Sequence, residues 1–373
     1  MTNRNDDGRH LDTLDRDLAR FSNLELATQY VSRPMVGPGI SILFVVLAGL
    51  LALLFLGQTT NTLIVVIAAC LGAYMALNIG ANDVANNMGP AVGANALSMG
   101  GAIGIAIVFE SAGALIAGGD VVSTIAKGII EPESMGDAQT FMWAMMAALL
   151  SAALWVNLAT WVGAPVSTTH SVVGGVMGAG IAAAGFAAVT WPTMGAIAAS
   201  WVISPVLGGA IAAGFLWLIK AKIIYTPDKI AAARKWVPIL VGIMAAAFAA
   251  YLALKGIKKL IKIDILTALA IGAAIGVITW LVMIPVIKKQ SEGLENRNKS
   301  LKVLFGIPLV VSAALLSFAH GANDVANAVG PLAAIVQVAE SGDFTQAFSI
   351  PAWVMIIGAF GISFGLFLFG PKL

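Results

Sequence analysis

The chain has 373 residues, of which 59% are hydrophobic and only 11% are charged. A soluble globular domain carries roughly 25% charged residues, so this composition excludes an ordinary soluble protein. The formal net charge of +2 is too small to indicate a nucleic-acid partner, and a single cysteine, Cys70, excludes an intrachain disulfide. The composition therefore predicts an all-α polytopic membrane protein.

The first part of the chain, residues 1–35, is polar. Met1–Arg33 contains six acids and five arginines and has no apolar run long enough to cross a bilayer. We predict a solvated N-terminal tail that precedes the first membrane span.

Ten apolar stretches follow the tail. Each approaches the roughly 20 residues that a transmembrane helix needs, although several are short or interrupted. They lie at Ile40–Leu56, Thr62–Ile79, Gly101–Ala117, Phe141–Val162, Ser171–Val189, Met194–Ile219, Val237–Leu254, Ile265–Ile287, Val303–Phe318 and Ala352–Phe369.

The heptapeptide Gly-Ala-Asn-Asp-Val-Ala-Asn occurs twice, at Gly80–Asn86 and at Gly321–Asn327, and Gly-Pro follows each copy. Each copy carries an aspartate, Asp83 or Asp324, into strongly apolar sequence. A carboxylate is costly within a membrane and is usually found facing a bundle interior, where it serves a substrate or ion pathway. The duplication therefore indicates two structural repeats that meet at one central site, as in secondary transporters.

A second unusual segment, Gly163–Ser171, also lies between apolar stretches. Pro165 should interrupt a helix, and Ser167, Thr168 and Thr169 would then stand where a new helix begins. A helix N-terminus offers unpaired N–H groups and the positive end of the helix dipole, which suit an anion. We predict a re-entrant or broken helix that binds an oxyanion. The alternative is that these hydroxyls only cap a helix or bond to a neighbouring one.

Two connections are rich in basic residues: Lys220–Lys235 and Lys288–Lys302 carry five each. Both should lie on the same side of the membrane, and their charge favours the cytoplasmic side of a cytoplasmic membrane. The Lys255–Lys262 loop on the opposite side carries four lysines and weakens this orientation.

The predicted organisation follows from the repeat. Residues 1–35 form the tail, 36–219 a first transmembrane repeat with both motifs, 220–302 central spans with short basic loops, and 303–373 a second repeat with the heptapeptide only. A second Ser-Thr-Thr-His would fall beyond Leu373, so we expect a fragment whose second repeat is incomplete.

The paired heptapeptides, together with Pro-Val-Ser-Thr-Thr-His after the first, resemble those of the inorganic phosphate transporter (PiT) family of cation-coupled symporters. The resemblance covers Ile40–Leu373. It implies two inverted repeats with helical hairpins, import of inorganic phosphate by symport with Na⁺ or H⁺, no cofactor beyond the coupling cation, no enzymatic activity and a tendency to form homodimers.

The resemblance also implies the roles of individual residues. The substrate-binding residues would be Asp83, Asp324, Ser167, Thr168 and Thr169. The residues that line the site or the ion path would be Asn82, Asn86, Asn323, Asn327 and Glu110, and a Na⁺ ion would lie at Asn82, Asp83, Asn323 and Asp324. In the family, the hydroxyl groups of two Ser-Thr-Thr motifs surround the phosphate. The second motif has no counterpart here, so half of these hydroxyl groups are absent.

The charges of the motif residues support cation coupling independently of the resemblance to the family. No Lys or Arg lies within the spans near Asp83 or Asp324, so Na⁺ or protons must balance a bound anion and two carboxylates. Asparagine side chains and the carbonyls of an unwound Gly-Ala-Asn segment are suitable oxygen ligands for Na⁺. Phosphate keeps a proton that it can donate to a carboxylate, whereas sulfate has none, so the aspartates favour phosphate.

Three further polar residues lie near the motifs. We expect Glu110 to lie near the transport path or to pair with a polar group. His170 and His320 each adjoin a motif, and we expect each to fix a broken helix by donating to a backbone carbonyl, although a proton relay is the alternative.

Four other functions compete with phosphate symport. A sulfate or other oxyanion permease would use the same scaffold. A passive channel needs a continuous lined pore, which two occluding copies do not favour. An intramembrane enzyme would use Ser167, His170 and Asp83, but the Pro165 break argues against a shared helix face. The fourth alternative is a membrane subunit that does not itself transport. It applies if the second repeat of the natural protein is as short as it is in this sequence.

Overall fold

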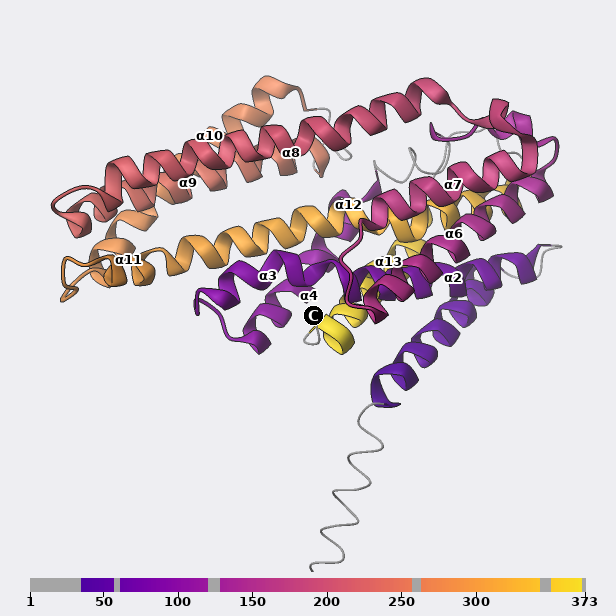
Figure 1. Cartoon of the computed structure of the whole chain (residues 1–373), viewed down its shortest axis with the longest axis horizontal. Coiled ribbons are helices and arrows are strands. Elements are labelled where there is room, and N and C mark those ends of the chain that lie inside the picture. The colour runs from indigo at the N-terminus through magenta and orange to yellow at the C-terminus, as the bar shows by residue number, and fades with distance from the viewer. Residues whose placement is uncertain (1–34, 57–60, 120–127, 257–262, 343–349, 371–373) are drawn as a thin grey trace, which may run out of the picture.

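The computed structural model describes residues 35–56, 61–119, 128–256, 263–342 and 350–370, without the side chains of residues 84–86. The described residues form helices joined by short connections, and their β-structure is one isolated bridge between Ile130 and Val189 (Figure 1). An unlabelled first helix, Met35–Leu56, is followed by α2 Thr62–Asn82, α3 Val84–Gly93, α4 Met99–Ala117, α6 Ala138–Trp161, α7 Thr168–Ala184, α8 Trp191–Ile219, α9 Lys229–Lys255, α10 Ile265–Gln290, α11 Asn298–Leu304, α12 Gly306–Ser341 and α13 Ala352–Phe369.

Nine helices of the described chain are long and apolar enough to cross a membrane, which confirms the all-α polytopic class. The predicted span Ser171–Val189, the fifth of the ten in chain order, is not among these nine helices. That stretch forms α7, whose 17 residues extend about 26 Å at 1.5 Å per residue, followed by a short 3-10 turn at Phe186–Ala188. Helix α7 is therefore shorter than each of the nine candidate spans and than the roughly 20 residues that a transmembrane helix needs.

Helices α6 and α7 form a helical hairpin, as predicted from Pro165. Helix α6 ends at Trp161, the tip carries Pro165, and α7 begins at Thr168. The open end of the hairpin is held by backbone hydrogen bonds from Glu131 N to Ala188 O and from Thr190 N to Ile129 O. Figure 1 shows the two helices lying side by side along the bundle.

The two heptapeptides differ in backbone structure. The first is interrupted at Asp83, between α2 and α3, whereas the second lies wholly inside the 36-residue helix α12. The expected unwound Gly-Ala-Asn segment is therefore wrong for both copies: Gly80–Asn82 ends α2, and Gly321–Asn323 is in mid-helix. In α12, the His320 side chain bonds to Asp324 one turn later, while the corresponding residue in α2 is Ile79, which has no polar group to offer.

The two motif helices pack through equivalent glycines. A methyl group on Gly80 of α2 would overlap the carbonyl of Ile362 in α13, and one on Gly321 of α12 would overlap the carbonyl of Glu110 in α4. Ser111 of α4 and Ser363 of α13, which follow Glu110 and Ile362 in the sequence, have their hydroxyls 2.7 Å apart. Helix α2 therefore packs on α13 as α12 packs on α4, and the absence of a side chain lets the backbones touch.

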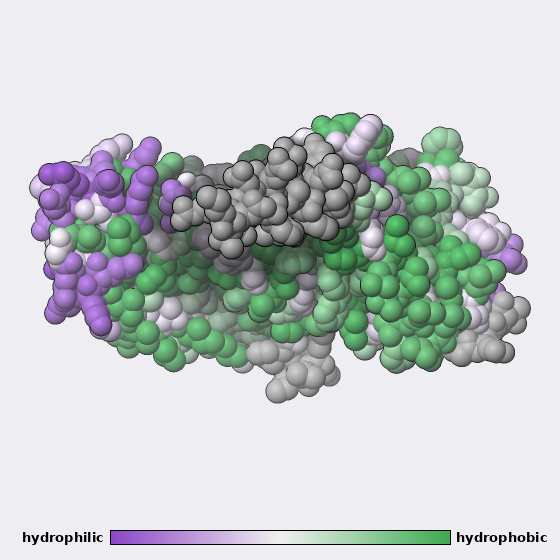
Figure 2. All heavy atoms as spheres, turned by 90° about the horizontal axis from the view of Figure 1, so that it is seen from below, coloured by the Kyte–Doolittle hydropathy of each residue, from purple (hydrophilic) through white to green (hydrophobic). Residues whose placement is uncertain are grey.

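Apolar side chains cover most of the face shown in Figure 2, and hydrophilic residues gather at one end. Helix α8 has no buried residue among its 29, which suits a helix that faces lipid. At the hydrophilic end, Lys229 N donates to Asn296 Oδ1 at 2.9 Å, and Arg234 Nε donates to Ser291 Oγ at 2.6 Å. These bonds place the two basic connections on the same side, as predicted. Of the opposing Lys255–Lys262 loop, residues 257–262 lie outside the described chain.

Candidate functional site

The tip of the α6–α7 hairpin meets both motif helices. Thr168, the first residue of α7, is 2% exposed, and Asp324, near the midpoint of α12, is 6% exposed. Asp83 lies at the interruption between α2 and α3 and is half-buried. Residues from three distant parts of the sequence therefore converge inside the bundle, as the duplicated motif predicts.

Thr168 lies between the two aspartates. Its Oγ1 is 2.9 Å from Asp83 Oδ2 and 3.1 Å from Asp324 Oδ2. A threonine hydroxyl has one proton, so it can donate to only one carboxylate at a time. The Asn327 amide nitrogen, 3.0 Å from Thr169 Oγ1 and 3.4 Å from Thr168 Oγ1, supports the hydroxyls from α12.

A chain of polar side chains leads away from Asp324. His320 Nε2 is 3.0 Å from Asp324 Oδ2, and His320 Nδ1 is 3.1 Å from Glu110 Oε1. Asn87 Nδ2 donates to the same glutamate oxygen at 3.2 Å. Glu110 is 1% exposed, and its Oε2 has no hydrogen-bond partner within the described part of the chain. The expectation that His320 donates to a backbone carbonyl is wrong, because both ring nitrogens face carboxylates.

Asn82 holds the hairpin tip in place. Its Nδ2 donates to Thr160 Oγ1 at 2.8 Å, and its Oδ1 accepts from Val166 N at 3.4 Å. One turn earlier, Asn78 Oδ1 accepts from Asn157 Nδ2 at 3.0 Å. These bonds join α2 to both sides of the tip and so set the position of Thr168.

The remaining predicted site residues differ in how they lie relative to the aspartates. The Ser167 hydroxyl is exposed and caps α7 by accepting from His170 N at 3.2 Å. The His170 ring lies against Trp201, with centroids 3.9 Å apart, so this serine and histidine show no nucleophile–base pairing. Asn323 is exposed, and its Nδ2 lies 3.3 Å from Asp324 Oδ1. The side chain of Asn86 lies outside the described residues.

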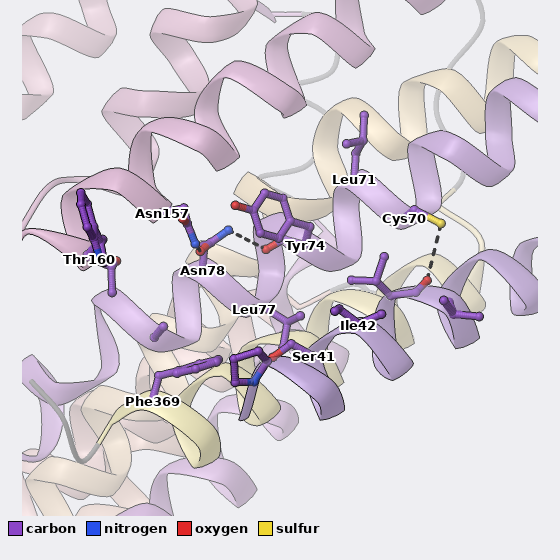
Figure 3. A pocket seen from close by; sticks show the side chains of 15 residues that line it. Ser41, Ile42, Cys70, Leu71, Tyr74, Leu77, Asn78, Asn157, Thr160 and Phe369 are labelled. Atoms are coloured by element: carbon purple, nitrogen blue, oxygen red, sulfur yellow. Dashed lines mark hydrogen bonds between the residues drawn. The ribbon is translucent and has the colours of Figure 1, made fainter. Parts of the chain in front are cut away.

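A cavity of about 610 Å³ lies on the other side of Asn78, between the first helix, α2, α6 and the end of α13 (Figure 3). Its walls are mainly apolar, and its polar lining residues are Ser41, Tyr74, Asn78, Asn157 and Thr160. Neither aspartate lines it. A polar anion gains nothing from such walls, so the cavity is not the candidate site.

Sequence reasoning missed the partners of the motif residues. Thr160 and Asn87 gave no signal, because an isolated Thr or Asn in an apolar helix is common. His320 did give one: it stands four residues before Asp324, a spacing that places two side chains on the same face of a helix.

These features define a polytopic helical transporter with a polar site enclosed between a hairpin tip and two motif helices. The chain belongs to the phosphate transporter family, whose model matches residues 79–373. This finding confirms the resemblance seen in the sequence and makes the chain an integral membrane protein.

Similar proteins agree with this assignment. A Helicobacter pylori (strain J99) protein named "Putative phosphate permease" is 49% identical over 360 residues, which cover 96% of this chain and 68% of that protein. A protein of Pyrococcus furiosus with a name of the same kind is 36% identical over 310 residues, covering 83% of this chain and 74% of that one. A solved structure entitled "The sodium-dependent phosphate transporter" matches with a TM-score of 0.78 and 37% identity, over 83% of this chain and 76% of the other.

Proposed function

We propose that this protein imports inorganic phosphate across the cytoplasmic membrane by symport with Na⁺, and that the phosphate binds where Thr168 approaches Asp83 and Asp324. The observation that carries the proposal is the single hydroxyl shared by two carboxylates, one buried and one half-buried. The similar solved structure, which is named as sodium-dependent, supports Na⁺ over H⁺. We also propose two inverted repeats, a homodimer and no enzymatic reaction.

Cation coupling follows from the charges at the site. Two ionised carboxylates that share one hydroxyl repel each other, and an incoming phosphate adds negative charge. Among the described residues, the basic side chain in contact with Asp324 is His320, which is already shared with Glu110. Na⁺ held by Asp83 and Asp324, with Asn82 and Asn323 nearby, would restore the balance and make phosphate binding depend on the cation.

Phosphate binding combines the start of α7 with the hydroxyls. The first N–H groups of a helix have no partner within it and are suited to an anion. Thr168 and Thr169 add two hydroxyls at that point, supported by Asn327. A protonated phosphate oxygen can donate to an aspartate, whereas fully ionised sulfate has no proton to give. The site should therefore prefer phosphate to sulfate.

The direct test is uptake of labelled phosphate by proteoliposomes that contain the purified chain. We expect uptake under an inward Na⁺ gradient and little under a pH gradient alone, with sulfate competing weakly. Uptake driven by the pH gradient alone would assign coupling to H⁺. Sulfate carried in place of phosphate would refute the substrate.

Replacing Thr168 tests the shared hydroxyl. Thr168→Val keeps the shape of the side chain but removes the oxygen, and we expect the KM for phosphate to rise by about 10- to 100-fold, since hydrogen bonds to charged groups contribute about 1.5–3 kcal/mol. Thr168→Ser keeps the hydroxyl and should stay near the wild-type KM. Equal KM values for the two variants would show that the hydroxyl does not bind substrate.

Removing the Asn82 side chain tests whether it holds the tip of the α6–α7 hairpin in place. In Asn82→Ala, the amides of residues 162–168 should exchange hydrogen with solvent faster, because two bonds from α2 to the tip are lost. Thr160→Val should give part of this effect, and the double variant little more than Asn82→Ala alone, because they share one bond. Additive effects in a double-mutant cycle would argue against the Asn82–Thr160 link.

A further inference from the structure

The polar chain beside Thr168 includes a histidine that Na⁺ binding does not use. Na⁺ is held by oxygen atoms, yet His320 Nε2 lies 3.0 Å from Asp324 Oδ2. One ligand atom from each of Asp83, Asp324 and His320 lies within 4.8 Å of the other two. Two carboxylates and an imidazole are a ligand set for divalent transition metals, which accept nitrogen as well as oxygen.

We propose that Asp83, Asp324 and His320 form a binding site for a divalent transition-metal ion such as Zn²⁺. The bound metal would compete with the coupling cation, a consequence that rests on the proposed phosphate symport. Ligand atoms around a tetrahedral zinc ion lie roughly 3.3 Å apart, given bonds of about 2.0–2.2 Å. Small side-chain shifts would bring the three atoms to this separation and leave a fourth position open, as in zinc sites that bind an exchangeable ligand.

The surroundings of His320 match those of a metal-binding histidine. Such a histidine almost always donates its other ring N–H to a carboxylate or carbonyl, which fixes the tautomer and points the free nitrogen at the metal. Here His320 Nδ1 is 3.1 Å from Glu110 Oε1, and Asn87 holds that glutamate oxygen in turn. Glu110 would therefore orient the metal ligand without touching the metal.

The α4–α12 contact and the α2–α13 contact have the same packing, but only the first contains the polar pair Glu110 and His320. The contact of α4 with α12 places Glu110 against Gly321, next to His320, and the equivalent contact of α13 with α2 places Ile362 against Gly80, next to Ile79. Ile79 and Ile362 are both buried and apolar. The same helix packing is therefore made without a carboxylate and a histidine, so the polar pair has a purpose beyond packing.

Competition with Na⁺ follows from the shared ligands. Asp83 and Asp324 are also the proposed cation ligands, and Thr168 bonds to both. A divalent ion on these carboxylates would occupy the oxygens that Na⁺ and the hydroxyl need. We expect micromolar Zn²⁺ to inhibit Na⁺-driven uptake, with reversal by a chelator and weaker inhibition at higher Na⁺.

The test is direct binding of Zn²⁺ to the purified chain in phosphate-free buffer by isothermal titration calorimetry, with Co²⁺ absorption as a report on geometry. We expect one bound ion in the wild type and an intense visible spectrum of tetrahedral Co²⁺. Glu110→Gln should weaken binding by about 10- to 100-fold, as loss of such an orienting partner does. The double variant Glu110→Ile/His320→Ile, which copies the residues of the other contact, should abolish it.

The matched control is His170→Ala, which removes an exposed histidine that lies against Trp201 and not at the aspartates. It should bind Zn²⁺ as the wild type does. Binding that survives the double variant, or that disappears with His170, would overturn the proposed site, as would a wild type that binds no Zn²⁺. Because binding is measured without transport, failure of phosphate uptake would leave this result intact, and uptake without Zn²⁺ binding would refute the metal site alone.

Discussion

Asp324→Asn should abolish Na⁺-driven phosphate uptake while the protein remains folded. The substitution keeps the size of the side chain but removes the charge that is proposed to hold the coupling cation. Removing one charge of a buried, hydrogen-bonded charge pair in a binding site costs about 2–5 kcal/mol of binding free energy, so we expect kcat/KM to fall by roughly 100-fold or more. The measurement is initial uptake in proteoliposomes across a series of Na⁺ concentrations.

Asp83→Asn provides the comparison, because the two aspartates occupy different positions. Asp324 is enclosed in α12 and bonded to His320, whereas Asp83 is half-buried at a helix interruption. We expect Asp83→Asn mainly to raise the Na⁺ concentration for half-maximal uptake, and Asp324→Asn to remove uptake at every concentration. Full activity in Asp324→Asn at wild-type Na⁺ dependence would refute the proposed site.

Gly80→Ala should strongly destabilise the protein. The added methyl would overlap the backbone carbonyl of Ile362 in α13, and backbone cannot move aside as a flexible side chain can. Overpacking typically costs about 1–3 kcal/mol, and an overlap with backbone should reach or exceed the top of that range. The loss would appear as a lower Tm of the purified protein in detergent and as a lower yield of monodisperse protein.

Gly178→Ala is the matched control, because an added methyl at that position of α7 meets nothing within 4 Å. Alanine is favoured over glycine within a helix by about 1 kcal/mol, so Tm should stay the same or rise. If both variants lost the same stability, glycine content and not the α2–α13 contact would explain the result.

Much of the fold was predictable from the sequence, because each prediction rested on the free-energy cost of placing a few neighbouring residues in the wrong environment or backbone conformation. Apolar runs of about 20 residues form most of the predicted spans, and the buried Asp324 faces inward. A proline alone was a weaker sign, because Pro165 interrupts a helix whereas Pro205 and Pro331 lie inside one. The backbone of the two heptapeptides was predicted less well. The heptapeptide was expected to unwind, yet Gly321–Asn323 stays helical in α12.

The backbone of the two heptapeptides and the partners of the motif residues could not be predicted from the sequence, for a physical reason. The identical heptapeptides have different backbones and different preceding residues, Ile79 in one copy and His320 in the other. The partner that explains His320 is Glu110, which lies 210 positions away in the chain. A contact of that separation is fixed by tertiary packing, and neither residue's own neighbourhood contains a sign of it.

The crossed packing of the motif helices has a consequence for how the protein is made. Helix α2, from the first half of the chain, packs its glycine face against α13, the last described helix. Helix α4, also from the first half, packs against α12 from the second half. Neither half can then be an independent folding unit, although each carries its own heptapeptide. During synthesis, α2 must remain in the bilayer with its glycine face uncovered until the last described helix is inserted.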